Sequence, residues 1–241
     1  MITRRLRPTE QYFPTEPWLE AYRDAINASA EYAERADGWG VDFDGSFVFQ
    51  IENVPLESKT VADLPPEIVE SVEHHANRTA RSTESILEDA PEDVRERIES
   101  RSGPLEERVA EEVLTTTLAD VPDRMWPELR ATLPDPIDDL IAQLEENVAA
   151  DGTIYAYLDL FDTECRGVDT LTDLEERRHG FRLVGDYEQW RTLVRGNGDV
   201  IDMLMAGDFE LDGDIQAILK YSDAAVALAE VSADLDSRFI V

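Results

Sequence analysis

The chain has 241 residues, of which 54 are acidic and 22 are basic, so its formal net charge at pH 7 is −32. A surface this negative argues against partners with a phosphate backbone and against docking on an anionic membrane, and a single cysteine excludes an internal disulfide framework and a multi-cysteine zinc site. Apolar residues make up 42% of the chain, and no run reaches the about 18 residues of a membrane span. We therefore expect a soluble cytoplasmic protein with a folded core, no stable membrane insertion and no nucleic-acid partner.

The negative charge is spread along the chain, with −15 in residues 61–150 and −17 in the remainder. Lysine is almost absent, since only Lys59 and Lys220 occur. Self-repulsion strains such a protein at low ionic strength, whereas molar salt shortens the screening length to about 3 Å. The composition is of the haloarchaeal type and indicates a halophilic protein of a salt-rich cytoplasm. An acidic surface for a basic partner is the competing interpretation.

The first predicted element is a helix over residues 15–36, with Pro17 in its first turn and an apolar stripe that includes Leu19, Tyr22 and Ile26. Residues 39–43 and 46–52 alternate as strands, and Asp44-Gly45 between them is a two-residue hairpin signal. Residues 63–149 show helical periodicity and no clear strand.

Strand patterns return at residues 154–160 and 180–185, and a helix is predicted over 187–195. Asp199 caps a short helix, a short strand covers 208–212, and a final helix rich in alanine begins at Asp214. This order of elements predicts an α+β protein with a mostly antiparallel sheet.

The sequence offers no catalytic or metal-binding constellation. With 54 carboxylates, close acidic pairs occur by chance and select no site. His74 and His75 are adjacent and point in different directions on a helix, His179 stands alone, and Cys165 has no local histidine signature. Phosphate-loop, dinucleotide-binding and hydrolase motifs are absent. We expect no enzyme activity, no metal and no cofactor.

The C-terminal part of the chain resembles a known family. Residues 199–219, DVIDMLMAGDFELDGDIQAIL, are similar to the end of the sterol carrier protein type-two domain: a short helix, a small residue with glycine, a strand with two apolar anchors, a second glycine with an acidic residue, and a helix. Residues 180–193, GFRLVGDYEQWRTL, look like that family's preceding strand and helix. With the strands at 153–160 and 47–51, the resemblance covers residues 15–60 and 151–235.

The resemblance implies a sheet of about five strands, mostly antiparallel and covered by helices, with a hydrophobic tunnel for sterols, fatty acyl chains or their coenzyme A esters. It implies a discontinuous domain, residues 1–60 with 151–241, interrupted by a helical insertion over 61–150. It also implies ligand-binding positions, which are the inward residues of the matching strands and helices: Phe47, Phe49, Ile51, Leu158, Phe181, Leu183, Met203, Leu204, Phe209, Leu211, Ile215, Ile218 and Leu219.

Three functions stay open at this point. The first, which we favour, is non-catalytic binding and transfer of an apolar lipid, with an acyl or isoprenoid chain a better candidate than a sterol in a salt-rich cytoplasm. The second is an interaction module with a filled core, in which residues 61–150 form a docking or homodimer surface. The third is an enzyme whose carboxylates act on a substrate in the pocket. An apolar cavity of several hundred Å³ favours the first, and a filled core with an exposed apolar patch on 61–150 favours the second.

Overall fold

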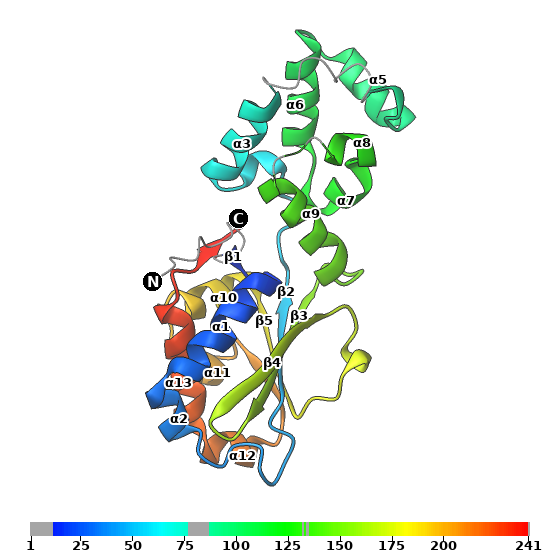
Figure 1. Ribbon diagram of the computed structural model, residues 1–241. Helices are drawn as coiled ribbons and strands as arrows, with labels where there is room; N and C mark the ends of the chain where they lie inside the picture. The colour runs from blue at the N-terminus through cyan, green and yellow to red at the C-terminus, as the bar shows by residue number, and fades with distance from the viewer. Residues whose placement is uncertain (1–11, 77–86, 132, 134, 241) are drawn as a thin grey trace. The chain divides into compact units, whose positions relative to one another are not determined.

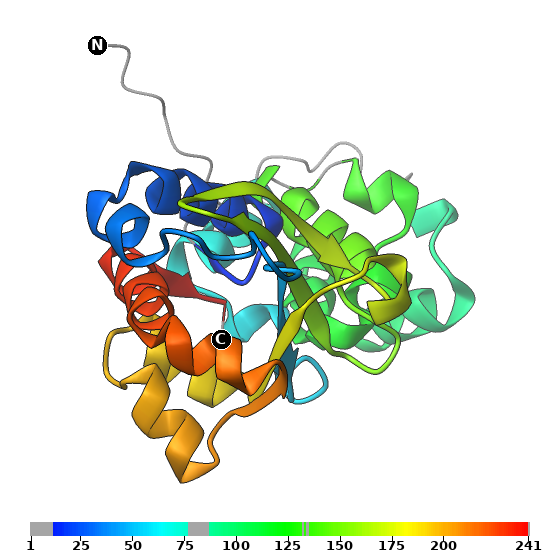
Figure 2. The ribbon, with the colours of Figure 1, turned by 90° about the horizontal axis from the view of Figure 1, so that it is seen from below.

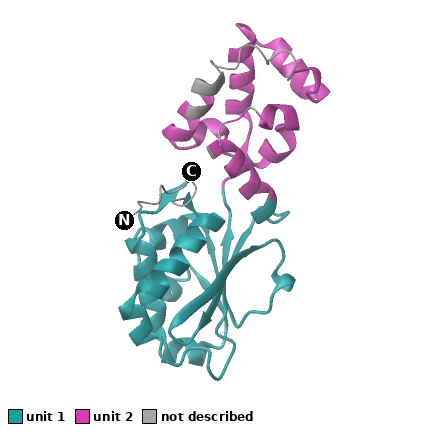
Figure 3. Ribbon diagram, viewed as in Figure 1, with its two compact units in different colours: residues 1–54, 146–239 teal, residues 55–145, 240–241 magenta. Residues whose placement is uncertain are grey.

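The computed structural model describes residues 12–76, 87–131, 133 and 135–240. The chain divides into two compact units (Figure 3). Unit 1 consists of residues 1–54 and 146–239, and unit 2 of residues 55–145 and 240–241. Nearly all of unit 2 is therefore inserted in the sequence between two strands of unit 1.

Unit 1 is built on a five-stranded sheet with strand order β4-β3-β2-β5-β6. The central strand β2 pairs antiparallel with β3 on one side and parallel with β5 on the other. The β3–β4 and β5–β6 pairs are antiparallel, so the sheet is mixed, with three antiparallel pairs and one parallel pair. The prediction of an α+β fold with about five mostly antiparallel strands is confirmed. The strands are β2 Phe47–Glu52, β3 Ile154–Phe161, β4 Glu164–Leu171, β5 Phe181–Asp186 and β6 Glu210–Gly213.

A layer of helices covers one face of this sheet (Figure 1). Seen from below, α13 (red) lies between α1 and α2 (blue) and the gold helices α10 and α11 (Figure 2), and it packs against all four. Phe47, Phe49 and Ile51 alternate along β2 and share the face toward the helices. Val48, on the other face, is buried in a smaller cluster with Tyr155, Tyr157 and Leu171. The helices are α1 Glu16–Ala28, α2 Ala30–Arg35, α10 Tyr187–Val194, α11 Val200–Ala206, α12 Ile215–Lys220 and α13 Ser222–Asp234.

The helix predicted over 15–36 is two helices that meet at Ser29. Thr15 caps α1 by accepting from the Trp18 backbone N–H, and the predicted stripe of Leu19, Tyr22 and Ile26 is buried. Ser29 ends α1 and caps α2, where its hydroxyl accepts from the Tyr32 backbone N–H. A serine that caps the second helix stabilises the break that the apolar stripe alone does not reveal.

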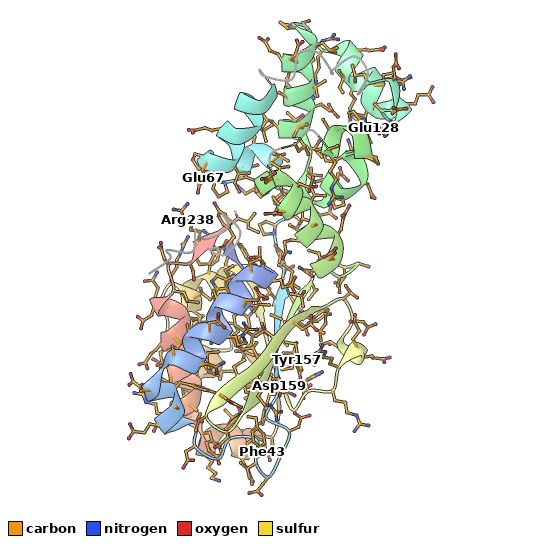
Figure 4. The ribbon with its side chains drawn as sticks, in the orientation of Figure 1. Phe43, Glu67, Glu128, Tyr157, Asp159 and Arg238 are labelled. Carbon is orange, nitrogen blue, oxygen red and sulfur yellow. The ribbon has the colours of Figure 1, made fainter. Side chains whose placement is uncertain are left out.

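The predicted hairpin at Asp44-Gly45 is wrong, because residues 39–43 form turns and bends instead of a strand. Both edges of β2 are already paired, with β3 and with β5, so no edge is left for a local partner. The Trp39 indole N–H donates to the Gly45 carbonyl oxygen at 2.8 Å, and the Phe43 ring packs edge-on against Trp39. Figure 4 labels Phe43 in this loop.

Strand β4 was not predicted, because its sequence ECRGVDTL lacks a clear alternation of apolar residues. It forms a hairpin with β3 and is an edge strand of the sheet. Asn27 of α1 holds this edge: its side-chain N–H donates to the Cys165 carbonyl oxygen at 2.9 Å, and its side-chain oxygen accepts from the Cys165 backbone N–H at 2.8 Å. A helix side chain thus occupies backbone groups of the edge strand that would otherwise be unpaired.

A second, two-stranded sheet joins the ends of unit 1. Strand β1, Tyr12–Phe13, pairs parallel with β7, Arg238–Phe239. The Trp18 indole N–H donates to the Ser237 hydroxyl at 2.9 Å, so the segment after α13 is fixed to α1.

Unit 2 is helical, as residues 63–149 predict, and its described residues show only an isolated bridge between Thr60 and Thr117. Its core contains a buried carboxylate, that of Glu112. The carboxylate accepts hydrogen bonds from Arg97 Nε at 2.7 Å and from Arg101 Nη2 at 2.8 Å. Burial opposes the charged form of Glu112, yet these hydrogen bonds hold its pKa below the ordinary value. The elements are η2 Val61–Asp63, α3 Pro66–Ala76, α5 Glu92–Ser100, α6 Leu105–Thr115, η3 Leu118–Asp120, α7 Val121–Arg124, α8 Pro127–Arg130 and α9 Asp135–Asn147, the last of which runs on into unit 1.

Candidate ligand-binding site

An apolar cavity of about 60 Å³ lies in unit 1 between the sheet and the helices. The sheet, α1 and α10 supply its larger side chains, α11 and α12 add aliphatic ones, and α13 contributes mostly small side chains together with Leu228. The lining residues are Phe13, Trp18, Tyr22, Phe47, Phe49, Leu183, Trp190, Leu193, Val194, Val200, Leu204, Leu211, Ile218, Ala225, Leu228, Ala229 and Ser232. The volume has room for a few water molecules or part of an aliphatic chain. It is smaller than the several hundred Å³ that would favour lipid binding over the other two functions.

Every polar side-chain atom of this lining is satisfied by the protein. The described lining has four such atoms, and each donates to a protein acceptor. Trp18 Nε1 donates to Ser237 Oγ at 2.9 Å, the Tyr22 hydroxyl to the Leu228 carbonyl at 2.8 Å, Trp190 Nε1 to the Gln50 carbonyl at 3.1 Å, and the Ser232 hydroxyl to the Ala229 carbonyl at 2.8 Å. Water in a cavity needs two to four polar partners, so this cavity favours apolar groups over water.

The cavity has no group that transfers protons near neutral pH. No aspartate, glutamate, histidine or lysine is among its described lining residues. The tyrosine in it, Tyr22, is fully buried in the core, and burial raises its pKa well above the ordinary value. Tyr22 therefore stays neutral, and the site is suited to binding by apolar contact.

Trp190 is the aromatic centre of the site. Its ring lies 4.8 Å from that of Phe49 and packs edge-on against Phe209 at 4.9 Å between centroids. Gly185 on β5 makes this packing feasible, because a Cβ atom there would lie 2.4 Å from the Phe209 ring. A glycine at this position lets the Phe209 and Trp190 rings pack directly against the strand backbone.

The structure divides the thirteen predicted ligand-binding residues into three groups. Six of them line the cavity: Phe47, Phe49, Leu183, Leu204, Leu211 and Ile218. Five are buried in the surrounding core and are not part of the lining: Ile51, Leu158, Phe181, Met203 and Phe209.

The remaining two predicted positions, Ile215 and Leu219, are corrected by the structure. They are 58% and 70% exposed and do not reach the cavity. The expected continuous helix from Asp214 is interrupted at Tyr221, which leaves α12 with only six residues. Of these six, Ala217 and Ile218 face inward, so a helix this short cannot bury Ile215 and Leu219 as well.

Several lining residues were not among the predicted positions. The segment before α1 and α1 itself contribute Phe13, Trp18 and Tyr22. Of these, Tyr22 was predicted to be on the apolar face of the helix but not to bind a ligand. Ala225 and Ala229 of α13 also line the cavity, and alanine is too common in helices to mark a site by itself.

The other residues considered for chemistry do not form a site. Among the described residues, no three His, Cys, Asp or Glu side chains gather as metal ligands, and no helix is long and apolar enough to cross a membrane. Burial raises the pKa of the Cys165 thiol to about 12, which makes it a poor nucleophile. His179 is half-buried, with its Nδ1 atom 3.2 Å from the Arg177 carbonyl oxygen, and the side chains of His74 and His75 lie outside the described residues.

No family model matches the chain, and no match is found among curated proteins. Two solved structures are similar to it. A crystal structure of sterol carrier protein 2 has 18% identity and a TM-score of 0.47, with 92% of this chain and 97% of that chain covered. A solution structure of a conserved hypothetical protein from Thermus thermophilus, described as a candidate sterol carrier protein, has 17% identity and a TM-score of 0.48, with coverage of 95% and 92%.

Proposed function

We propose that unit 1 binds the aliphatic chain of a lipid, acyl or isoprenoid, in the cavity beneath α13 and carries it without chemical change. The observation that carries this proposal is the lining, which is apolar throughout and whose polar side-chain atoms are all paired with protein groups. Each methylene group moved from water into such a site contributes about 0.8 kcal/mol. Affinity then comes from burial, and selectivity for a particular chain is weak.

The present volume of about 60 Å³ holds only part of a chain, so binding a whole chain requires the lining to move outward. The short helix α11 is the element best suited to this. It has seven residues, it contributes Val200 and Leu204 to the lining, and its next residue, Met205, is 85% exposed. A helix this short is held mainly by the packing of its inner face, which a bound chain can replace.

Neighbouring residues of α11 provide a matched test. Leu204→Asp places a charge on the cavity wall, whereas Met205→Asp places the same charge on the exposed side of the same helix. We expect Leu204→Asp to weaken binding of an aliphatic chain at least tenfold in isothermal titration calorimetry, and Met205→Asp to leave it unchanged. Circular dichroism establishes that both variants are folded. Unchanged binding in a folded Leu204→Asp protein would contradict the site.

Native mass spectrometry with solvent extraction identifies the ligand. The protein is purified in high salt from its own host and desalted only before measurement. A stoichiometric lipid is the expected result. An empty protein that also takes up no acyl or isoprenoid chain in molar salt would favour the alternative, an interaction module with a filled core.

A further inference from the structure

A second hollow lies on the surface of unit 1 beside the cavity. It is a groove of about 470 Å³ between α13 and the loop that joins α10 to α11. Three residues, Leu193, Val200 and Ala229, line both the groove and the cavity. The two spaces are therefore separated by shared side chains, and a chain that displaces them passes from one to the other.

The sequence of α13 marks the connection. Ala225, Ala229 and Ala233 are four residues apart and share one face of the helix. Ala225 lines the cavity only, Ala229 lines both spaces, and Ala233 lines the groove only. A row of methyl groups thus runs from the cavity into the groove.

The loop opposite α13 is kept close by glycine. Gly196 has a φ of +68°, and a Cβ atom there would lie 3.1 Å from the Ala233 Cβ. Any larger residue at either position would narrow the groove at the point where it continues the alanine row. The groove is therefore shaped by small residues on both sides.

The groove differs from the cavity in its charge. Asp199, Glu230 and Asp234 line it, and no lysine, arginine or histidine is among its described lining residues. Glu230 also pairs with Arg35 of α2 at 3.0 Å, and the Asp199 carboxylate caps α11, so protein groups already offset part of this negative charge. Glu230 and Asp234 are four residues apart on α13, next to the alanine row, so their carboxylates border the path. Carboxylates accept hydrogen bonds and repel negative charge.

We propose that the groove holds the polar end of the ligand, and that this end is a hydrogen-bond donor without negative charge, a hydroxyl or an ammonium group. The inference rests on the proposed function, since the aliphatic part of the same ligand occupies the cavity. A carboxylate or phosphate end has no proton to donate to these carboxylates. It is repelled mainly by Asp234, because Arg35 offsets the charge of Glu230.

Three probes with the same twelve-carbon chain test this: dodecanol, dodecylamine and dodecanoate. Their affinities for the full-length protein are compared by calorimetry at pH 7 in 0.5 M and 3 M KCl. We expect dodecanol and dodecylamine to bind more tightly than dodecanoate, by about two- to fivefold for each carboxylate, the size of an exposed charge interaction. The difference is expected to shrink in 3 M KCl, where screening is stronger.

Two substitutions that each remove one negative charge distinguish an effect of the groove from an effect of the protein's overall negative charge. Asp234→Asn removes a groove carboxylate, and Asp223→Asn removes an exposed carboxylate of α13 that does not line the groove. We expect only Asp234→Asn to raise the affinity for dodecanoate relative to dodecanol, by about two- to fivefold. Ala233→Trp, which fills the groove and leaves the cavity lining unchanged, is expected to weaken dodecanol binding at least tenfold.

The outcomes separate this inference from the proposal on which it rests. Equal affinities for the three probes, an unchanged preference in Asp234→Asn, or unchanged dodecanol binding in Ala233→Trp would overturn the role of the groove and leave the cavity as the binding site. If no probe binds, the proposed function fails, and the inference fails with it.

Discussion

Replacing Ala225 with leucine tests whether the space beneath α13 is a cavity that a side chain or a ligand can fill. Ala225 is half-buried and lines the cavity but not the groove. A cavity of about 60 Å³ costs about 1.4 kcal/mol at about 24 cal/mol per Å³. Fixing one leucine side chain in a helix costs about 0.7 kcal/mol. We therefore expect Ala225→Leu to raise the free energy of unfolding of unit 1 by about 0.7 kcal/mol.

The same substitution is expected to weaken binding of an aliphatic chain at least tenfold, because the added side chain occupies the space that the ligand needs. Urea unfolding in molar KCl measures the stability, and calorimetry with dodecanol measures the binding. A Trp126→Phe background makes tryptophan fluorescence specific for unit 1, since Trp126 is the tryptophan of unit 2.

Ala233→Leu is the matched control, because it adds the same side chain on the same helix in the open groove. We expect it to change the free energy of unfolding by less than about 0.5 kcal/mol. A loss of more than about 1 kcal/mol in Ala225→Leu would mean that the added carbons are overpacked and that no fillable space exists there. Unchanged dodecanol binding in Ala225→Leu would refute the position of the binding site.

Four further predictions concern the rest of the molecule. Asn27→Ala removes the two hydrogen bonds that join α1 to the edge strand β4, and we expect urea unfolding to show a loss of about 2 kcal/mol in unit 1. The Cys165 thiol, whose pKa burial raises to about 12, is expected to resist iodoacetamide at pH 8 until the protein is unfolded, as measured by mass spectrometry. Glu112→Gln removes the buried carboxylate that Arg97 and Arg101 share and leaves them only their exposed partners Asp93 and Glu111, and it is expected to destabilise unit 2 by about 2 kcal/mol in Trp126 fluorescence. In the parent protein, this stabilisation is present above the ordinary glutamate pKa of about 4.3 and is lost as the pH falls through the lowered pKa of the folded state. The free energy of unfolding is expected to rise with KCl concentration, because salt screens a net charge of −32, and a protein most stable at low salt would contradict the halophilic interpretation.

The strands that the sequence predicts correctly are β2, β3 and β5, in which apolar residues alternate on the side of the helices. In β2 and β3 the intervening residues are buried as well. The apolar residues toward the helices recur at every second position and are mostly large, apart from Ala156 of β3 and Gly185 of β5, which is the pattern that periodicity detects. Strand β4 escapes detection because edge strands carry charged residues, here Glu164, Arg166 and Asp169. The false hairpin at Asp44-Gly45 has a different cause: the partners of β2 lie more than a hundred residues away, so a local turn signal says nothing about which strands pair with it.

The candidate site was predictable only as a set of buried residues. Phe49 and Ile51 lie on the same face of β2 and have the same apolar character, yet only Phe49 lines the cavity. Periodicity reports that a side chain faces inward, and it cannot report whether the neighbouring volume is filled. The exposed Ile215 and Leu219 show the reverse error, because the break at Tyr221 that turns them outward has no strong signal in the sequence.

The cavity exists because of residues that hydrophobic periodicity does not single out. Trp18 on α1 and Trp190 on α10 are large and rigid, and each is fixed by a hydrogen bond from its indole N–H, so neither can turn to fill a gap. The opposite side of the cavity is α13, which presents the methyl groups of Ala225 and Ala229 where a leucine would close the core. The missing volume therefore follows from alanine facing fixed aromatic rings. The alanine row also continues into the acidic groove through Ala233, so the residues that leave unit 1 less stable than it could be are the ones along which we propose that a chain enters.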